Sequence, residues 1–216
     1  MVQVIHTEQT FEEFIEAHLV EHGGYKTASP TVYDRKRALI PEQVIDFVRK
    51  TQPKIWSALE AIHKEKLPTQ LIDTLCQVLD KRGMLKVLRE GFKFYGKKVR
   101  VAYFEPGHNL NPDVWALYVQ NDLRLVRQLR YDPNNENELD LAIFLNGLPI
   151  ATAELKNPLT GQTVANAKRQ YREDRDQKAP IFRWTKRALV HFAVDTEEVW
   201  MTTKLAGQST FFLPFN

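Results

Sequence analysis

An aspartate, a glutamate and a lysine flank an apolar β-hairpin in the segment NELDLAIFLNGLPIATAELKNP, residues 137–158. The turn dipeptide Asn-Gly between two apolar runs is the strongest short-range signal for such a hairpin. Asp140 and Glu154 are equally distant from Gly147 along the chain, which predicts that they lie opposite each other near the open end. Side chains on a strand alternate with a period of two, so Lys156 projects from the same face as Glu154. Three ionisable groups are therefore predicted to share one site.

Two carboxylates this close repel each other, and a cation between them relieves the repulsion. Mg²⁺ is bound by one or two carboxylates and keeps several waters, which suits phosphate chemistry. A neighbouring lysine can position or deprotonate the attacking water. The three residue types thus fit metal-assisted hydrolysis of a phosphodiester. Spacing alone leaves a second interpretation open, in which Asp140 and Glu154 are strand-end charges in a surface salt bridge with Lys156.

Helices are predicted for the first half of the chain that must support this hairpin. An apolar stripe over residues 10–24 predicts the first helix, with a capping-box pattern at its start and Gly23 as a stop. The stripe consists of Phe11, Phe14, Ile15 and Leu19, and the capping-box residues are Thr10 and Glu13. Three further helices are predicted over residues 41–50, 53–65 and 69–83, because each segment opens near a Pro or Thr and has apolar residues three and four apart. These helices should form a bundle-like subregion.

Strands are predicted for most of the second half, where the apolar period changes to two. They cover residues 98–104, 124–131, the two arms of the hairpin, 187–195 and 198–203, and a polar helix is predicted over residues 163–176. The sequence therefore predicts a mixed α/β (α+β) fold, a sheet with helices against it. No internal repeat or Gly/Ser-rich linker interrupts the chain, so residues 1–216 are predicted to form a single domain.

The composition is that of an ordinary globular protein, with 43% hydrophobic and 26% charged residues in 216. A formal net charge of +3 permits a polyanionic partner without requiring one. The single cysteine, Cys76, excludes an intramolecular disulfide, and the N-terminus lacks the basic and apolar regions of a signal peptide. No apolar run approaches the roughly 20 residues that cross a bilayer. A cytoplasmic protein without membrane insertion is expected.

The runs LDLAIFLNGLPIATAELKNP and NAKRQY and the tail FAVDTEEVWMTTKLAGQSTFFLPFN resemble the N-terminal nuclease region of the restriction (R, motor) subunit of type I restriction-modification enzymes. The likeness covers most of the chain. It implies a PD-(D/E)xK nuclease with a restriction-endonuclease-like core, whose central mixed sheet is flanked by helices. In that family an acid and an acid-x-Lys pair hold Mg²⁺, and the resemblance carries these roles to Asp140, Glu154 and Lys156. Leu139 stands where the name of the motif has proline, which metal binding does not need.

The same family has a glutamate on an early helix beside the metal, and this chain offers Glu12 and Glu13. Glu12 borders the apolar stripe, whereas Glu13 lies far from Ile15 around the helix and is engaged in capping. We therefore expect Glu12 to be a metal ligand. The alternative is an ordinary first-turn acid favoured by the helix dipole. The resemblance further implies one domain with a helical insertion at about residues 41–90 and a catalytic core at about 91–205.

The helix after the acid-x-Lys strand carries a Gln-x-x-x-Tyr pattern in the family, counted as part of the nuclease site. Gln170 matches the first position, but Asp174 stands where tyrosine is expected. On the same helix Lys168, Arg172 and Arg175 recur at spacings of four and three, which predicts a basic face toward the DNA backbone. The acids between them leave open an alternative, a solvated helix with salt bridges.

The chain contains no G-x-x-x-x-G-K-[ST] loop, so we expect it not to bind ATP in that manner. In the family this region precedes two ATP-driven translocase domains, which implies that the chain is a fragment and that the full-length subunit uses ATP. The resemblance also implies three partners: double-stranded DNA, the methyltransferase (M) subunit and the specificity (S) subunit.

Two other function classes compete with a Mg²⁺-dependent endonuclease. One is a non-catalytic DNA-binding or interaction domain that retains the nuclease fold, which the intact Asp140, Glu154 and Lys156 disfavour. The other is a hydrolase that uses Asp140 and Glu154 as general acid and base in the manner of glycosidases. The lysine and the family likeness weigh against this second alternative.

Overall fold

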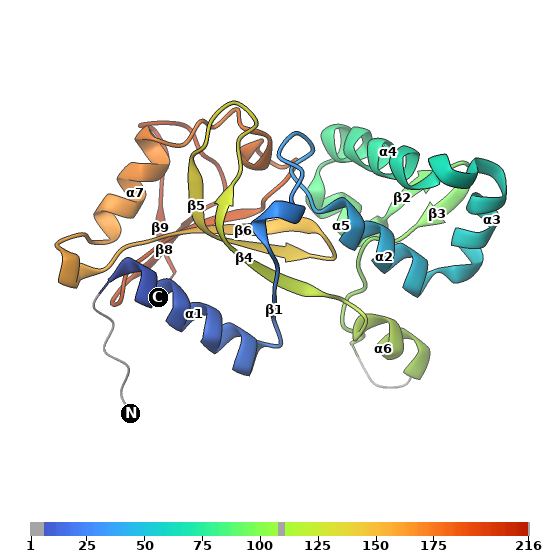
Figure 1. Ribbon diagram of the computed structural model, residues 1–216, viewed down its shortest axis with the longest axis horizontal. Helices are drawn as coiled ribbons and strands as arrows, with labels where there is room; N and C mark the ends of the chain where they lie inside the picture. Colours follow the sequence, from blue (N-terminus) through green and yellow to red (C-terminus); the bar gives the residue numbers. More distant parts are fainter. Residues whose placement is uncertain (1–6, 108–110, 216) are drawn as a thin grey trace.

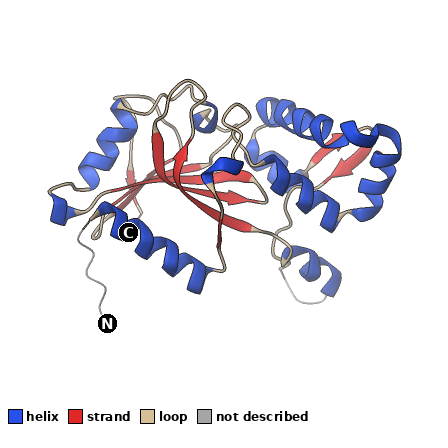
Figure 2. Ribbon diagram, viewed as in Figure 1, coloured by secondary structure: helices blue, strands red, loops and turns tan. Residues whose placement is uncertain are grey.

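A mixed β-sheet with helices on both faces forms one lobe of the protein, and a helical lobe lies beside it (Figures 1 and 2). The structure is a computed structural model that describes residues 7–107 and 111–215. Within them the larger sheet has seven strands in the order β1-β4-β5-β6-β7-β8-β9. These are β1 (Lys26–Thr27), β4 (Leu123–Arg130), β5 (Glu138–Leu145), β6 (Leu148–Leu155), β7 (Val190–Val194), β8 (Val199–Thr202) and β9 (Leu213–Pro214). The predicted mixed α/β class is confirmed.

The predicted hairpin, β5 and β6, lies in the middle of this sheet. β4, β5 and β6 follow one another as antiparallel neighbours, whereas β6 and β7 are parallel. A parallel pair requires a crossover connection, and α7 (Val164–Glu173) provides it. β7 then pairs antiparallel with β8, as the two alternating runs near the C-terminus predicted. Both strands of the acidic hairpin therefore have a neighbour on each side.

Helix α1 (Glu8–Gly23) covers one face of the sheet (Figure 1). Phe11 is buried with Leu125, Leu141 and Leu155 in an apolar cluster between the helix and the strands. The predicted capping box was placed one turn too late: Thr7 is the N-cap and pairs with Thr10, so the helix begins before Thr10. Phe14 was predicted on the buried stripe but is 43% exposed, since a helix that lies on a sheet buries only a narrow stripe.

Helix α7 covers the opposite face, where the main core of the sheet lobe lies. Its buried side chains are Val164, Ala167 and Tyr171. The helix ends at Glu173, before the predicted limit of residue 176, with Asp174 as its C-cap. Arg175 is therefore not part of the helix, which changes the direction of its side chain.

The helical lobe consists of α2 (Pro41–Thr51), α3 (Pro53–His63), α4 (Leu67–Arg82) and α5 (Met84–Glu90), packed against a hairpin of β2 (Phe92–Phe94) and β3 (Lys97–Val99). The three helices predicted for this region are confirmed with small shifts of their ends. Its core also contains Leu148, so the tip of the β5–β6 hairpin is packed into the helical lobe.

The predicted strand over residues 98–104 stops at Val99. Helices α5 and α6 (Pro112–Tyr118) were not predicted.

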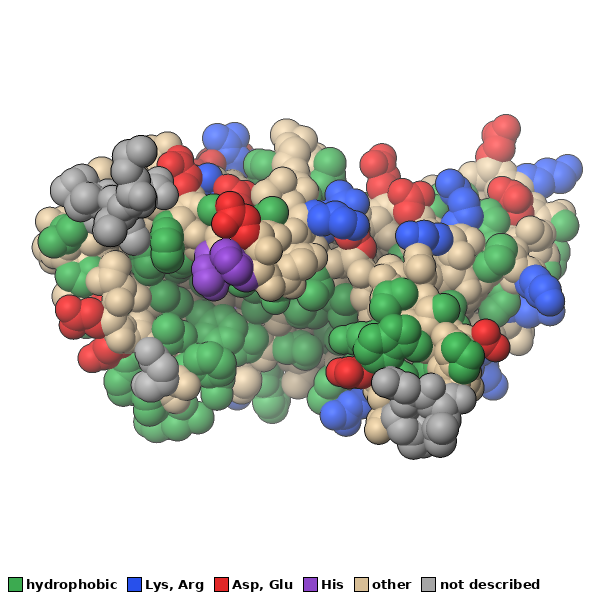
Figure 3. Space-filling model, turned by 90° about the horizontal axis from the view of Figure 1, so that it is seen from below, with side chains coloured by type: hydrophobic (Ala, Val, Ile, Leu, Met, Phe, Trp, Pro, Cys, Tyr) green, Lys and Arg blue, Asp and Glu red, His purple; other side chains and the backbone are tan. Residues whose placement is uncertain are grey.

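The α1 side of the sheet lobe is only partly covered. Hydrophobic side chains gather over this lobe on the face seen in Figure 3. An apolar cavity of about 180 Å³ lies here, lined by residues of α1 and of the central strands, among them Ile15, Leu19, Ile143 and Phe192. In the part of the chain that the structure describes, no helix is both long and apolar enough to cross a membrane.

Candidate active site

A β-bulge sets the register of the acidic hairpin. Its turn, Asn146 and Gly147, has left-handed φ angles of 51° and 84°, the geometry that an Asn-Gly turn favours. Leu145 pairs with Leu148 next to the turn, but farther out Leu141 pairs with Ala153, so one extra residue has entered β6. The bulge therefore shifts the register by one residue.

This shift brings the two candidate acids together. Beyond the pair of Leu141 and Ala153, Asp140 and Glu154 occupy the next positions along the two strands. A two-residue turn without a bulge would place Ala153 opposite Asp140. Equal spacing of Asp140 and Glu154 from Gly147 predicts the observed pairing, although the bulge that produces this pairing has no signal in the spacing. The bulge therefore belongs to the geometry of the site.

Glu154 is a fully buried carboxylate, with 0% exposure. Its Oε1 accepts a hydrogen bond from Nε of Arg175 at 2.6 Å. Its Oε2 has no hydrogen-bond partner among the described residues. Burial raises the pKa of Glu154 to about 8, and the charge of Asp140 contributes, whereas Arg175 and Lys156 act in the opposite direction. Oε1 of Glu154 is thus hydrogen-bonded, whereas Oε2 has no hydrogen bond within the described structure.

Asp140 and Glu12 complete a group of carboxylates at this end of the hairpin. Oδ2 of Asp140 accepts a hydrogen bond from the backbone N–H of Leu155 at 2.7 Å. Glu12 is only 5% exposed. Burial raises its pKa, and the charge of Asp140 raises it further, while hydrogen bonds from Gln128 and Arg127 lower it. The charge of Asp140 therefore acts on both buried glutamates.

A local break in β4 holds Glu12 in place. Gln128 has a left-handed φ of 48°, a strained conformation for a residue other than glycine. From this position its side-chain amide donates to Oε1 of Glu12 at 2.7 Å. Glu13 lies on the more exposed side of α1, with 42% side-chain exposure. The structure thus places Glu12, rather than Glu13, with the carboxylates.

Lys156 is nearly buried and contacts the first turn of α1. Its Nζ lies 3.4 Å from Oε2 of Glu8, whose Oε1 is buried without a hydrogen-bond partner among the described residues. Glu8 was not predicted as a site residue. A signal was present, because Glu8 and Glu12 are four residues apart and share one face of a helix. Lys156, which directly follows the end of β6, therefore has its ion-pair contact with an acid on α1.

Arg175 was predicted to contact DNA, and the structure corrects this expectation. Its side chain is 5% exposed, and its guanidinium donates to Oε1 of Glu154 and, through Nη2, to the backbone oxygen of Glu138 at 2.7 Å. A buried guanidinium with these partners cannot lie on an exposed basic face. Since Arg175 follows the end of α7, the helical spacing that grouped it with Lys168 and Arg172 does not apply.

The other residues predicted on α7 keep some exposure but have contacts within the protein. Nζ of Lys168 lies 3.7 Å from the ring centre of Trp200, and Arg172 donates two hydrogen bonds to the backbone oxygen of Thr210. Gln170 is half-buried. Asp174, at the position where tyrosine was expected, is exposed at the end of the helix.

A chain of hydrogen bonds lies in the core near Glu154. Oγ1 of Thr152 is 2.8 Å from the Tyr171 hydroxyl and 2.8 Å from Nδ1 of His191. Burial lowers the pKa of His191 to about 3, so the imidazole is neutral at physiological pH. Thr152 and Glu154 are two positions apart on β6 and share one face of the strand. The network therefore fixes the strand segment that carries the buried carboxylate.

The donor set suits a hard divalent cation, although the carboxylates are not arranged as a complete cage. In residues 7–107 and 111–215, no group of three or more His, Cys, Asp or Glu side chains is arranged to hold a metal ion. Oε2 of Glu154, which has no hydrogen-bond partner among the described residues, is nevertheless an oxygen donor, and the charge of Asp140 raises the pKa of both Glu154 and Glu12. Mg²⁺ needs only one or two carboxylates and keeps waters for its other positions. Asp140 and Glu154 can meet that requirement.

The raised pKa of Glu154 predicts a pH-dependent stability in metal-free buffer. Its folded pKa of about 8 lies above the unfolded value of 4.5, so its contribution is complete below pH 4.5 and is lost as the pH rises through about 8. The free energy of unfolding should fall by about 1 kcal/mol per pH unit between pH 6.5 and 8. Glu154→Gln should flatten this slope in chemical denaturation, and Glu13→Gln should retain it. Equal slopes in wild type and Glu154→Gln would contradict the raised pKa of Glu154 as the cause of the pH dependence.

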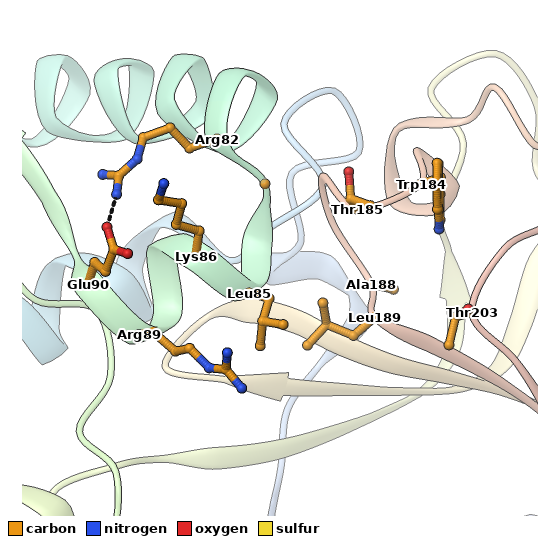
Figure 4. Close-up of a pocket in the computed structure, with 11 residues that line it drawn as sticks. Arg82, Leu85, Lys86, Arg89, Glu90, Trp184, Thr185, Ala188, Leu189 and Thr203 are labelled. Atoms are coloured by element: carbon orange, nitrogen blue, oxygen red, sulfur yellow. Dashed lines mark hydrogen bonds and ion pairs between the residues drawn. The ribbon is translucent and has the colours of Figure 1, made fainter.

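A second cavity lies away from these carboxylates, at the junction of the two lobes (Figure 4). It has a volume of about 530 Å³ and opens between α5 and the loop that precedes β7. Arg82, Lys86 and Arg89 line one side, and Trp184, 55% exposed, lines the other. Only Glu90 among the lining residues is acidic, and it pairs with Arg82. The cavity therefore has a positively charged wall.

A mixed sheet between helices, with an acid and an acid-x-Lys pair on a central hairpin, defines a restriction-endonuclease-like domain. Comparison with known families agrees with this class: the family model of the type I restriction enzyme R protein N terminus matches residues 5–210. The chain belongs to this family. No curated protein matches the chain.

Proposed function

We propose that this protein is a Mg²⁺-dependent endonuclease domain of a type I restriction enzyme R subunit, which hydrolyses phosphodiester bonds in double-stranded DNA. One observation carries the proposal: a fully buried glutamate, Glu154, has a free carboxylate oxygen and lies with Asp140 and Lys156 at the end of one hairpin. A buried carboxylate oxygen without a hydrogen-bond partner is costly, so the retention of Oε2 in this state suggests a ligand. Membership of the restriction enzyme family supports DNA as the substrate.

The residues divide into distinct roles in this proposal. Asp140 and Glu154 hold the metal through carboxylate oxygens, and Glu12 supplies a further oxygen from α1. A Mg²⁺ ion held by these residues would supply Lewis-acid chemistry, which activates water and neutralises charge on the phosphate. Lys156 orients the attacking water or stabilises the negative charge that develops, and Glu8 holds its ammonium group at 3.4 Å. Gln170, on the adjacent helix, is the candidate for a hydrogen bond to phosphate.

The alternative is a non-catalytic domain that retains the nuclease fold. The ion pair of Glu154 with Arg175 is the observation that favours it, since such a pair could serve the fold alone. Cleavage by the assembled enzyme with Glu154→Gln separates the two proposals. Loss of cleavage supports the endonuclease, and normal cleavage supports the alternative.

The family also suggests the setting in which the domain acts. We propose that it works in the cytoplasm with the methyltransferase and specificity subunits. The full-length R subunit would use ATP for translocation in domains that follow this one. Such an arrangement would bring DNA to the nuclease by translocation rather than by tight binding. The modest net charge of +3 agrees with weak binding by this domain alone.

The charged cavity between the lobes is our candidate for a contact with the DNA backbone. Lys168 and Arg172 have the alternative contacts described above, whereas Lys86 and Arg89 are exposed and have no salt-bridge partner among the described residues. Phosphate contacts need exposed cations, and each contact steepens the salt dependence of binding by about one unit. These two residues meet that requirement better than the predicted face on α7.

The double variant Lys86→Ala/Arg89→Ala should weaken DNA binding without sequence preference. The slope of log affinity against log salt should become shallower by about two units. Lys97→Ala/Lys98→Ala is the matched control, because it removes the same charge from two exposed lysines of β3 outside the cavity. Fluorescence anisotropy with a labelled duplex at several salt concentrations measures the slopes. Equal slopes in the two variants would exclude the cavity as a DNA contact.

A further inference from the structure

The contacts of Arg175 suggest a specific role for this buried side chain. Its Nε donates to Oε1 of Glu154 at 2.6 Å, and its Nη2 donates to the backbone oxygen of Glu138 at 2.7 Å. The guanidinium also lies over the Tyr131 ring, 5.6 Å from its centre. Since the guanidinium is planar and rigid, these contacts from two strands fix its orientation. Arg175 therefore holds Glu154 from a fixed position.

The geometry of the pair differs from that expected of a purely structural ion pair. Arginine and carboxylate frequently bind through two parallel hydrogen bonds, which satisfy both oxygens. Here only Oε1 of Glu154 is bound, because the second donor of Arg175 turns to the Glu138 carbonyl. Oε2 of Glu154 consequently has no hydrogen-bond partner among the described residues. The pair holds the carboxylate while leaving one buried oxygen available.

We propose that Arg175 is a positioning residue, which fixes Glu154 so that Oε2 is presented to a divalent cation. This inference rests on the proposed function, because it assigns Oε2 to the metal. Residues that orient a metal ligand without touching the metal commonly change metal affinity or activity by about 10- to 100-fold when they are replaced. Arg175 acts through Glu154 in the same way. It does not contact the DNA in this role.

Arg175→Lys tests the inference, because lysine keeps the positive charge but cannot hold Glu154 and the Glu138 carbonyl with one planar group. Its affinity for Mn²⁺, used as the probe, should fall about 10- to 100-fold. Isothermal titration calorimetry of the folded chain gives this value separately from stability. Arg172→Lys is the matched control, since Arg172 donates to the Thr210 carbonyl and not to a carboxylate. In the assembled enzyme, Arg175→Lys should raise the Mg²⁺ concentration for half-maximal cleavage, and excess Mg²⁺ should restore the rate.

A third variant, Glu154→Gln, distinguishes failure of this inference from failure of the proposed function. If Glu154→Gln loses Mn²⁺ binding but Arg175→Lys binds like wild type, the role of Arg175 is overturned and the metal site stands. If Glu154→Gln binds Mn²⁺ like wild type, or wild type does not bind at all, both proposals fail.

A measurement on the wild-type chain covers the case in which Arg175→Lys does not fold. The Nε–H group of Arg175 has its own resonance in ¹⁵N NMR spectra. Addition of Mg²⁺ should shift this resonance while its slow exchange with water persists, because Arg175 keeps its hydrogen bond to Glu154. If the Nε–H proton of Arg175 instead exchanges rapidly with water after Mg²⁺ is added, the cation has displaced Arg175 from Glu154. That result would overturn the inference.

Discussion

DNA cleavage by the assembled restriction enzyme is expected to fall to background when Glu154 is replaced by Gln, while ATP hydrolysis continues. The substitution keeps the size of the side chain and an oxygen that can accept from Arg175, but it removes the charge that would hold the metal. The loss should exceed the roughly 10- to 100-fold that follows removal of an outer partner of a metal ligand. ATP hydrolysis should survive because the chain contains no phosphate-binding loop. Parallel assays of plasmid cleavage and ATP turnover measure both activities.

Glu13→Gln serves as the control for this experiment. It makes the same chemical change on the more exposed side of α1, and cleavage should be preserved. Asp140→Asn and Lys156→Ala should behave like Glu154→Gln, because the three groups form one site. Normal cleavage by Glu154→Gln would reject the nuclease assignment, whereas loss of ATP hydrolysis as well would indicate failed assembly.

Gly147→Ala is expected to lower the free energy of unfolding by about 3 kcal/mol or more, because it combines backbone strain with a steric conflict. Gly147 has a left-handed φ of 84°, and an added Cβ would lie 2.5 Å from the backbone oxygen of Ile40 and 2.9 Å from Cγ2 of Val44. The hairpin tip cannot move away freely, because the Ile40 N–H donates to the Gly147 oxygen at 2.8 Å. Chemical denaturation measures the loss in the free energy of unfolding.

Gly96→Ala separates backbone strain from steric conflict at the same kind of position. Gly96 has a φ of 75°, but an added Cβ would meet no atom within 4 Å. Its substitution should therefore cost only the left-handed strain, about 1–2 kcal/mol. An equal loss in the two variants would show that contact between the hairpin tip and the helical lobe contributes little to stability.

The helices of the second lobe could be predicted from the sequence because their signals are local. Proline at the first position of α2 and α3, and apolar residues three and four apart, act within one helix whatever surrounds it. The strand predicted over residues 98–104 ends at Val99 for the opposite reason. Alternation describes the pattern of a strand, but a strand also needs a partner. Within the described part of the chain, β3 pairs only with the short β2.

The residues of the candidate site on the hairpin and Glu12 on α1 could be predicted from the sequence, but the contact of Arg175 with them could not. Asp140, Glu154 and Lys156 could be selected because a hairpin relates them through a short turn and a period of two. Glu12 could be selected over Glu13 by its angle on α1, and the structure buries it with the carboxylates. Arg175 was assigned to an exposed face because helical spacing was extended beyond Glu173, where α7 ends.

The types of the candidate site residues, the hairpin that carries them and the amphipathic helices could be read from the amino-acid sequence, since each depends on neighbours within a few residues. Tertiary structure decided the rest. It placed Arg175 against Glu154, Glu8 against Lys156 and Gln128 against Glu12, contacts between residues that are 21, 148 and 116 positions apart. Such pairs leave no periodic pattern in the sequence. They form because α1 and the segment after α7 pack onto the central strands. The same packing buries Glu154, and burial is the main cause of its raised pKa.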